Sequence, residues 1–448
     1  MNSKNEVIRM RLMATLLAVT GMMTSMAQGQ QSPMQLDITL AKAIDIALAE
    51  NPVVKIADRD VELKRVADTE AWKALLPEAT ATASIQHTLL AAEMNLGGNK
   101  FKMGQDNTNT GALSGTVSIP VFAPAVYRNM KLTKQDILLA QEKARGSRLD
   151  LVNQVTKAYY QMLLAQDSRR VMLESYNTSK ENYEVVKAKY DVGRVSEYDK
   201  ISAEVQMRSM NSNLVSVENG LTLAELQLKV LMGIDTGLKL HIDDELDNYA
   251  NTLKLPGTAA DAELDNNSSL KQIDMNRKMV EQSLNIQRTN FMPTVAFVLT
   301  GQYQSLYNKG WDVWNYHWSP SASFSVAVNV PLFRASNWTK LKSTKLQLTQ
   351  LDDTRENTRR QLSMAAQSYR SNMSSSVAQT ESNREAVRQA DKAVSIAAKR
   401  YEVGRGTILE LNQSEVALTS ARLTYNQSIY DYLVAKADLD YTLGRSNF

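Results

Sequence analysis

Residues 189–194 read Lys-Tyr-Asp-Val-Gly-Arg, and residues 400–405, which lie 211 positions later, read Arg-Tyr-Glu-Val-Gly-Arg. Two further pairs keep the offset of 211: Ser118-Ile-Pro-Val-Phe122 with Asn329-Val-Pro-Leu-Phe333, and Leu231-Met-Gly233 with Thr442-Leu-Gly444. Loops tolerate insertions, whereas long packed helices do not. A spacing kept constant over this length therefore predicts one long unit that is present twice and is built around a rigid rod.

Each copy opens with a helical pattern that ends at a proline. Residues 37–76 place apolar side chains on one helical face, with an interruption at Asn51-Pro52 because the residue before proline avoids helical geometry. The pattern ends at Leu75-Leu-Pro77, and its copy passes Asn267-Ser268 and ends at Phe291-Met-Pro293. The prolines thus mark the same boundary in both copies.

After each of these prolines the hydrophobic period changes from 3.6 to 2, which predicts strands. Four such stretches alternate small or polar with apolar side chains, and they form two β-hairpins at about 78–120 and 294–331. Residues 88–109 are rich in Gly, Asn and Thr, as an exposed hairpin tip should be. A sheet packed on an ordinary core would show a similar alternation, so the strands alone do not establish a membrane location.

The tryptophans favour a membrane barrel over that alternative. One precedes the first strand, three lie in the second hairpin tip and one follows the fourth strand, so all are expected at strand ends and none in the helices. Aromatic belts at the two interfaces of a bilayer have this distribution. The expected membrane-interface aromatics are Trp72, Trp311, Trp314, Trp318 and Trp338.

Long helices follow each hairpin. Residues 124–192 contain no proline after Pro124 and a single glycine, and their apolar residues recur every three or four positions. This pattern predicts a coiled-coil helix, with a copy at 335–403. Gly193 and Gly404 then stand where a helix C-cap favours a left-handed residue.

Capping patterns begin the two returning helices, which are expected at 196–232 and 407–443. Ser196 and Thr407 are the expected helix caps, because an acid follows each of them three residues later, as in a capping box. The chain is thus expected to comprise a signal peptide at 1–27, a first repeat at 28–233, an irregular segment at 234–262 and a second repeat at 263–448.

Composition excludes several classes of function. Residues 1–27 carry a positive start, a short apolar run and small residues at the expected cleavage point, which predicts a secretory signal peptide. A net charge of +3 over 448 residues gives no electrostatic case for nucleic acid. The chain has no cysteine, three scattered histidines and no phosphate loop, nucleophile elbow or HExxH pattern. Neither an enzyme nor a metal or other cofactor is expected.

Four strands are too few to close a membrane barrel, since the smallest such barrels have about eight. Open strand edges within lipid would leave backbone groups unpaired. A dimer would supply eight strands, which side chains fill, whereas a trimer would supply twelve and leave a passage. The small, polar strand faces suit a wet lumen, so a trimer is expected.

The order and duplication of these motifs resemble the outer membrane efflux protein family, the TolC-like ducts of Gram-negative bacteria. The resemblance rests on Asn51-Pro52, Leu75-Leu-Pro77, Ile119-Pro-Val-Phe122 with its copy, and two tips of the pattern Y-x-V-G-R-x-[ST]-x-x-[DE]. It implies a mainly helical fold with a membrane β-barrel portion, in which a homotrimer shares a twelve-stranded outer membrane barrel continued by a periplasmic α-helical barrel. It also implies a passive duct that performs no chemistry.

The same resemblance implies partners and site residues. The partners would be a periplasmic adaptor (a membrane fusion protein), an inner membrane pump of RND or ABC type, and outer membrane lipid. Asp199, Tyr401 and Glu410 match positions that close the hairpin tips or ring them with negative charge. Gly406 and Gln413 depart from the family pattern of a gate arginine and a second acid, which leaves Arg194 or Arg405 as the expected gating partner. The adaptor-docking tips would consist of Val192, Gly193, Arg194, Val195, Val403, Gly404, Arg405 and Gly406.

Two other functions remain open from the sequence. The duct could belong to type I protein secretion, because no residue pattern separates that role from small-molecule efflux. The helices could instead form a periplasmic coiled-coil scaffold that never enters a bilayer. The substrate, the adaptor and the pump leave no recognisable motif in this chain.

Overall fold

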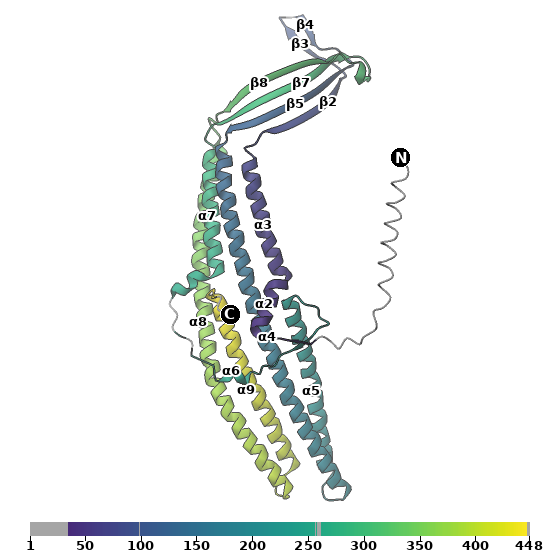
Figure 1. The fold of residues 1–448 in the computed structure, drawn as a ribbon, viewed down its shortest axis with the longest axis vertical. Helices are drawn as coiled ribbons and strands as arrows, with labels where there is room; N and C mark the ends of the chain where they lie inside the picture. Colours follow the sequence, from purple (N-terminus) through teal and green to yellow (C-terminus); the bar gives the residue numbers. More distant parts are fainter. Residues whose placement is uncertain (1–34, 98, 256, 258–260, 446–448) are drawn as a thin grey trace, which may run out of the picture.

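The computed structural model describes residues 35–445 except residues 98, 256 and 258–260. Figure 1 shows an elongated molecule with a curved sheet at one end and the tips of two helical hairpins at the other. The signal peptide expected at 1–27 lies outside the described residues. The predicted fold class, mainly helical with β-hairpins and two repeats, is confirmed.

Both repeats contain helices, then a β-hairpin, a long helix and a returning helix, although the hairpin of the first repeat has two extra strands. The first comprises β1 (Gln35–Asp37), α2 (Leu40–Glu50), α3 (Pro52–Lys73), β2 (Glu78–Thr88), β3 (Ala92–Leu96), β4 (Asn99–Met103), β5 (Thr108–Phe122), α4 (Pro124–Asp191) and α5 (Glu197–Met232). Next come β6 (Lys239–His241), α6 (Asp247–Ala250), η1 (Asp261–Asn266), α7 (Ser268–Thr289), β7 (Thr294–Asn308), η2 (Val313–Asn315), β8 (Ser319–Asn329), α8 (Ala335–Glu402) and α9 (Ile408–Thr442). The helices α4 and α8 each have 68 residues, so both rods are roughly 100 Å long at 1.5 Å per residue.

An asparagine joins the start of each repeat to its end. Asn51 accepts the Val53 N–H at its Oδ1 (2.8 Å) and donates from its Nδ2 to the carbonyl of Leu231 (2.7 Å). Asn267 likewise accepts the Ser269 N–H (2.8 Å) and donates to the carbonyl of Thr442 (2.8 Å). Both asparagines are buried. Each therefore caps one helix and satisfies a carbonyl at the end of another.

Replacing Asn267 by alanine is expected to lower the free energy of unfolding by about 2–3 kcal/mol, because a helix cap and a buried carbonyl partner are lost together. The variant Asn267→Asp keeps the accepting oxygen but removes the donor, so it should lose less. Thermal and denaturant unfolding of the two variants beside the unaltered chain measures both effects. Unchanged stability of Asn267→Ala would contradict the assigned role.

Glycine ends both returning helices where these asparagines approach. Gly233 and Gly444 have φ values of +70° and +65°. A Cβ added at Gly444 would lie 2.4 Å from the carbonyl oxygen of Asn266, and one at Gly233 would lie 3.0 Å from the backbone of Asn51. Both the left-handed conformation and the close approach require glycine. This explains why the two copies share a glycine at the end of the unit.

The four long strands form one antiparallel sheet in the order β2-β5-β7-β8. Because neighbouring residues of a strand point to opposite faces, the register shows which side chains share a face. One row across all four strands is polar, and the row beside it is apolar: Thr80, Thr116, Thr300 and Ser323 against Ala79, Val117, Leu299 and Phe324. No described residue of the single chain covers much of the apolar face, since Phe324 is 75% exposed and Val326 is 61% exposed.

Two small sheets were not expected from the sequence. The segment 88–109, expected as an exposed hairpin tip, contains the antiparallel ribbon of β3 and β4. The segment 234–262, expected to be irregular, contains β6, which pairs in parallel with β1. Asp37, expected in a helix, belongs to β1, because α2 begins only after Thr39, whose hydroxyl accepts the Lys42 N–H (3.4 Å).

A buried acid fixes the segment between the repeats to α4. Asp167 accepts the Leu246 N–H (3.0 Å) and pairs with Arg170 (2.8 Å), which also pairs with Glu245. Burial raises the pKa of Asp167, although the Leu246 N–H opposes this effect. The segment therefore lies against α4 through specific polar contacts.

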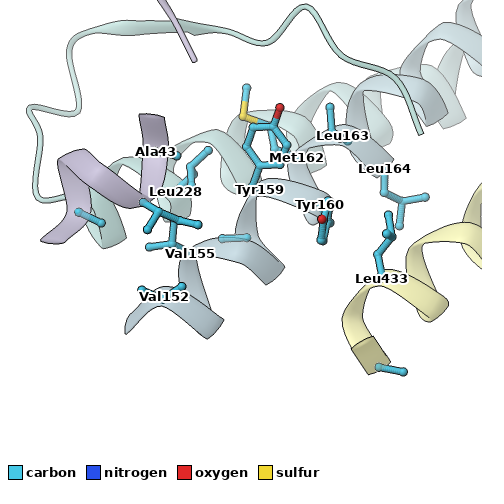
Figure 2. Packing of buried hydrophobic residues seen from close by; sticks show 14 of the residues in the cluster. Ala43, Val152, Val155, Tyr159, Tyr160, Met162, Leu163, Leu164, Leu228 and Leu433 are labelled. Atoms are coloured by element: carbon cyan, nitrogen blue, oxygen red, sulfur yellow. The ribbon is translucent and has the colours of Figure 1, made fainter. Parts of the chain in front are cut away.

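The main hydrophobic core lies where α2, α4, α5 and α9 meet. Figure 2 shows Tyr159 and Leu163 of α4 among side chains from the other helices, including Ala43, Leu228 and Leu433. All five side chains are nearly inaccessible to solvent. No described helix combines the length and the apolarity that a membrane crossing requires.

Two of the tryptophans lie within α-helices and Trp314 lies in the 3₁₀ helix η2, which corrects the expectation that no tryptophan lies in a helix. Trp72 lies in the last turn of α3 and Trp338 in the first turn of α8. The reason is that both helices extend to within a few residues of the strands, past the aromatic positions. Both indoles remain exposed, at 44% and 64%, and Trp338 packs edge-on against Phe291 with 5.2 Å between ring centroids.

Candidate gate and docking tips

Both hairpin tips have the same backbone geometry. Gly193 has a φ of +71°, and the Arg194 N–H donates to the carbonyl of Lys189 (2.8 Å). Gly404 has a φ of +72°, and the Arg405 N–H makes the equivalent bond (2.8 Å). This is the glycine-dependent closure of a helix C-terminus. The repeated Val-Gly-Arg triplet therefore fixes the shape of each tip.

The caps of the two returning helices differ. Ser196 and Asp199 form a complete capping box, since each side chain accepts the other's N–H at 3.2 Å. Thr407 accepts the Glu410 N–H (3.2 Å), but the Glu410 carboxylate pairs with Arg400 of α8 (3.5 Å) instead of completing a box. The expected box is therefore complete only in the first repeat, and Glu410 keeps a half-exposed charge beside the second tip.

Tyr401 lies where the two hairpins meet. It packs against a buried tip cluster formed by Val186, Ala203, Ile408 and Leu411, one residue from each of α4 and α5 and two from α9. Its hydroxyl is buried and has no hydrogen-bond partner within the described residues. Burial, followed by the charge of Asp199, raises the pKa of Tyr401. The structure thus brings Asp199 and Tyr401 together across the hairpins, whereas Glu410 faces its own hairpin.

The predicted docking residues, 192–195 and 403–406, lie at the ends of the two helical hairpins. We call these two segments the crowns. Val192 and Val403 are 69% and 67% exposed, and Gly193, Arg194, Gly404 and Arg405 are exposed beside them. Val195 and Gly406 are half-buried. A Cβ added at Gly406 would lie 3.1 Å from the Cβ of Arg400, so a larger side chain there would displace its neighbour. Among the described contacts, neither Arg194 nor Arg405 forms a side-chain ion pair.

A second contact between the hairpins was missed by sequence reasoning. We call it the hairpin seam, and it consists of Ser175, Ser179 and Asn182 of α4 with Glu415 and Thr419 of α9. Asn182 donates to Glu415 Oε1 (2.5 Å), and the Thr419 hydroxyl donates to Ser175 Oγ (2.9 Å). Glu415, Ser179 and Thr419 are buried. No sequence signal marks the seam, because the burial of Glu415 depends on a helix of the other repeat.

The tryptophans of the second β-hairpin differ in their surroundings. Trp314 is 94% exposed, whereas Trp311 stacks on His87 with 5.4 Å between ring centroids. Trp318 donates to the carbonyl of Val313 (3.3 Å) and covers Gly111, where an added Cβ would lie 2.7 Å from the indole. Trp314 therefore has the surface position expected of an interface anchor, while Trp318 also packs within the hairpin.

Across the described residues, His, Asp and Glu side chains nowhere gather into a group of three or more that could hold a metal ion. The molecule instead presents an amphipathic sheet above paired helical rods with matching tips. These features define a duct-forming channel subunit. The family model of the outer membrane efflux proteins matches residues 43–234 and 259–445, so the chain belongs to the outer membrane efflux protein family.

Membership makes the chain an outer membrane efflux channel that extends into the periplasm, and this family consists of channels rather than enzymes. Outer membrane protein TolC of Vibrio cholerae is 22% identical over 398 residues, which cover 87% of this chain and 86% of that protein. Alkaline protease secretion protein AprF of Pseudomonas aeruginosa is 23% identical over 420 residues, covering 89% of this chain and 83% of that protein. A crystal structure of CusC shares the fold, with a TM-score of 0.74 at 18% identity over 92% of this chain and 93% of that one.

Proposed function

We propose that three copies of this chain form one exit duct, in which twelve strands close a barrel in the outer membrane and the helices continue its bore through the periplasm. The two-sided sheet carries the proposal. Its apolar face has no core to cover it, and β2 and β8 are its edges. Because lipid offers no partner for an open strand edge, β8 of one copy must pair with β2 of the next.

The periplasmic end would dock a partner. We assign the exposed crowns at 192–195 and 403–406 to contact with a periplasmic adaptor, which connects the duct to an inner membrane pump of RND or ABC type. Support comes from the exposed valines, from arginines that form no ion pair within the described part of the chain, and from a backbone fixed by glycine. Asp199, Tyr401 and Glu410 would form the gate above these crowns. The pump drives the substrate, and lumen width and charge select it.

Protein secretion is a second candidate, favoured by the similarity to a protein named for alkaline protease secretion. Both candidates use the same duct and differ in cargo and pump. Deleting the gene and measuring dye retention in cells beside the protein content of the medium separates them. Retained dye with an unchanged set of secreted proteins supports efflux, and the reverse supports secretion.

The tip assignment predicts that Gly404→Leu and Glu410→Arg each impair export several-fold while the trimer still assembles. Leucine disfavours the φ of +72° that shapes the second crown, and arginine at 410 would face Arg400 at the present 3.5 Å contact. Gly220→Leu is the matched control, because Gly220 lies within α5 at an ordinary φ with open space around it. Normal export by both tip variants would remove the assignment.

A further inference from the structure

We propose that Glu415 is a proton-sensitive positioning residue that holds the two helical hairpins of each chain together and loosens them when it ionises. This inference rests on the proposed opening of the duct at the hairpin tips. It adds a residue that lies outside the tips, and it gives that opening a dependence on pH.

Glu415 lies where a contact would hold the two helical hairpins of one chain together. Figure 1 shows the hairpin of α4 and α5 and the hairpin of α8 and α9 extending together away from the sheet. Any separation of these hairpins must break the seam between α4 and α9. The seam contains the Asn182–Glu415 and Ser175–Thr419 hydrogen bonds, and the ion pair of Arg422 with Glu174 (2.8 Å) joins the same two helices.

The surroundings of Glu415 suit a neutral carboxyl better than a charged one. The residue is 7% exposed. Its Oε1 accepts one hydrogen bond from the neutral amide of Asn182, and its Oε2 is buried with no partner among the residues that the structure describes. Ser179 Oγ is also buried in the seam without a partner, so it does not serve that oxygen either. A buried carboxylate with a single neutral donor is costly.

No opposite charge offsets this cost. The charged residues that flank this level are Glu174, Lys180, Glu181, Glu184, Lys187 and Lys189 of α4, Glu204 and Arg208 of α5, Asp391, Lys392, Lys399 and Arg400 of α8, and Glu410 and Arg422 of α9. They are exposed to solvent or engaged with partners other than Glu415: Glu204 with Arg208, Glu410 with Arg400, Arg422 with Glu174 and Asp391, and Lys189 with the Tyr401 ring. Burial therefore dominates and raises the pKa of Glu415 to about 7, although the Asn182 hydrogen bond opposes it.

The direction of the pH effect follows from proton binding. When the hairpins separate, water reaches the carboxyl and its pKa returns toward the ordinary value of 4.5. The joined seam thus binds the proton more tightly than the separated one, so it is most stable below about pH 4.5. As the pH rises from about 4.5 to about 7, the separated form ionises first and the joined form loses its advantage. Acid should therefore hold the duct closed.

Conductance of the full-length protein in a planar bilayer, recorded from pH 4.5 to 8, tests the proposal. We expect opening to increase by about tenfold or more over this interval, as a shift of at least one pKa unit requires. Glu415→Gln mimics the neutral acid and should remain closed with a flat pH profile. Asn182→Ala removes the donor that opposes the shift, so its response should move to higher pH. Asp431→Asn is the control, because Asp431 is an exposed acid on the same helix.

A Glu415→Gln variant that migrates as a trimer and keeps the pH profile of the unaltered protein would overturn the proposal. An unchanged profile in Asn182→Ala would overturn it as well. A disulfide between cysteines at 175 and 419 separates this failure from that of the proposed function. If the disulfide blocks conductance but conductance does not depend on pH, the result contradicts the role of Glu415 and leaves the proposed opening of the hairpins intact. If the disulfide has no effect on conductance, the result also contradicts the proposed opening of the hairpins.

Discussion

Replacing Ser175 and Thr419 together by cysteine is expected to close the duct under oxidising conditions and to reopen it on reduction. The two hydroxyl oxygens are 2.9 Å apart across the hairpin seam, so the new sulfurs can meet with little backbone movement. The natural chain has no cysteine, which makes the introduced pair its only thiols. A covalent bond resists any thermal separation of the hairpins. Export and conductance should fall by about tenfold or more when the bond forms.

The chain offers a control disulfide of similar geometry that does not cross the seam. Thr380 of α8 and Ser428 of α9 are joined by a hydroxyl–hydroxyl hydrogen bond of 3.1 Å, and both residues belong to the second hairpin. Cysteines at 380 and 428 should also form a bond, but they tie a hairpin to itself and should leave export unchanged. Equal inhibition by the two disulfides would point to general damage. Full activity of the oxidised seam variant, with the bond confirmed on a gel, would contradict hairpin separation.

The duplication and the faces of the strands could be predicted because glycine, proline and alternation act locally. Pro77 and Pro293 mark where helices give way to strands, and Gly193 and Gly404 mark the tips. The long helices follow from the scarcity of such residues, since α4 has no proline after Pro124 and one glycine, Gly146, and α8 has neither residue type. Each of these signals depends on the backbone preference of one residue type, so it can be recognised in the sequence without knowledge of the fold.

Features that depend on distant partners were not predictable. The strands β1 and β6 have three residues each and pair across about 200 positions of sequence, so neither shows a pattern of its own. Glu415 looks like an ordinary surface acid of α9 until α4 of the other repeat covers it. Asp199 completes a capping box and Glu410 does not. This difference likewise depends on Arg400, which pairs with the Glu410 carboxylate. Sequence patterns predict elements, whereas contacts between repeats decide which polar residues become buried.

Substituting Phe324 by arginine is expected to abolish assembly in the outer membrane. Phe324 lies near the middle of β8, opposite Leu299 and on the apolar face of the sheet. An arginine at the bilayer midplane on the lipid face of a barrel costs about 2–4 kcal/mol. The same substitution in a single chain surrounded by water would cost little, because Phe324 is already 75% exposed. Outer membrane fractionation and the heat-modifiable trimer band on a gel measure the effect.

The adjacent residue provides the matched control. Ser323 lies on the opposite face, in the polar row with Thr116 and Thr300, which the proposed trimer directs toward the lumen. Ser323→Arg should therefore assemble normally and shift the conductance toward anions, because the added charge lines the bore. Two arginines one position apart thus separate a lipid-facing from a water-facing surface. Normal membrane assembly of Phe324→Arg, or loss of assembly for Ser323→Arg alone, would contradict the assigned faces of the sheet. It would also contradict the proposed barrel, since a barrel in lipid requires the apolar side of the sheet to face outward.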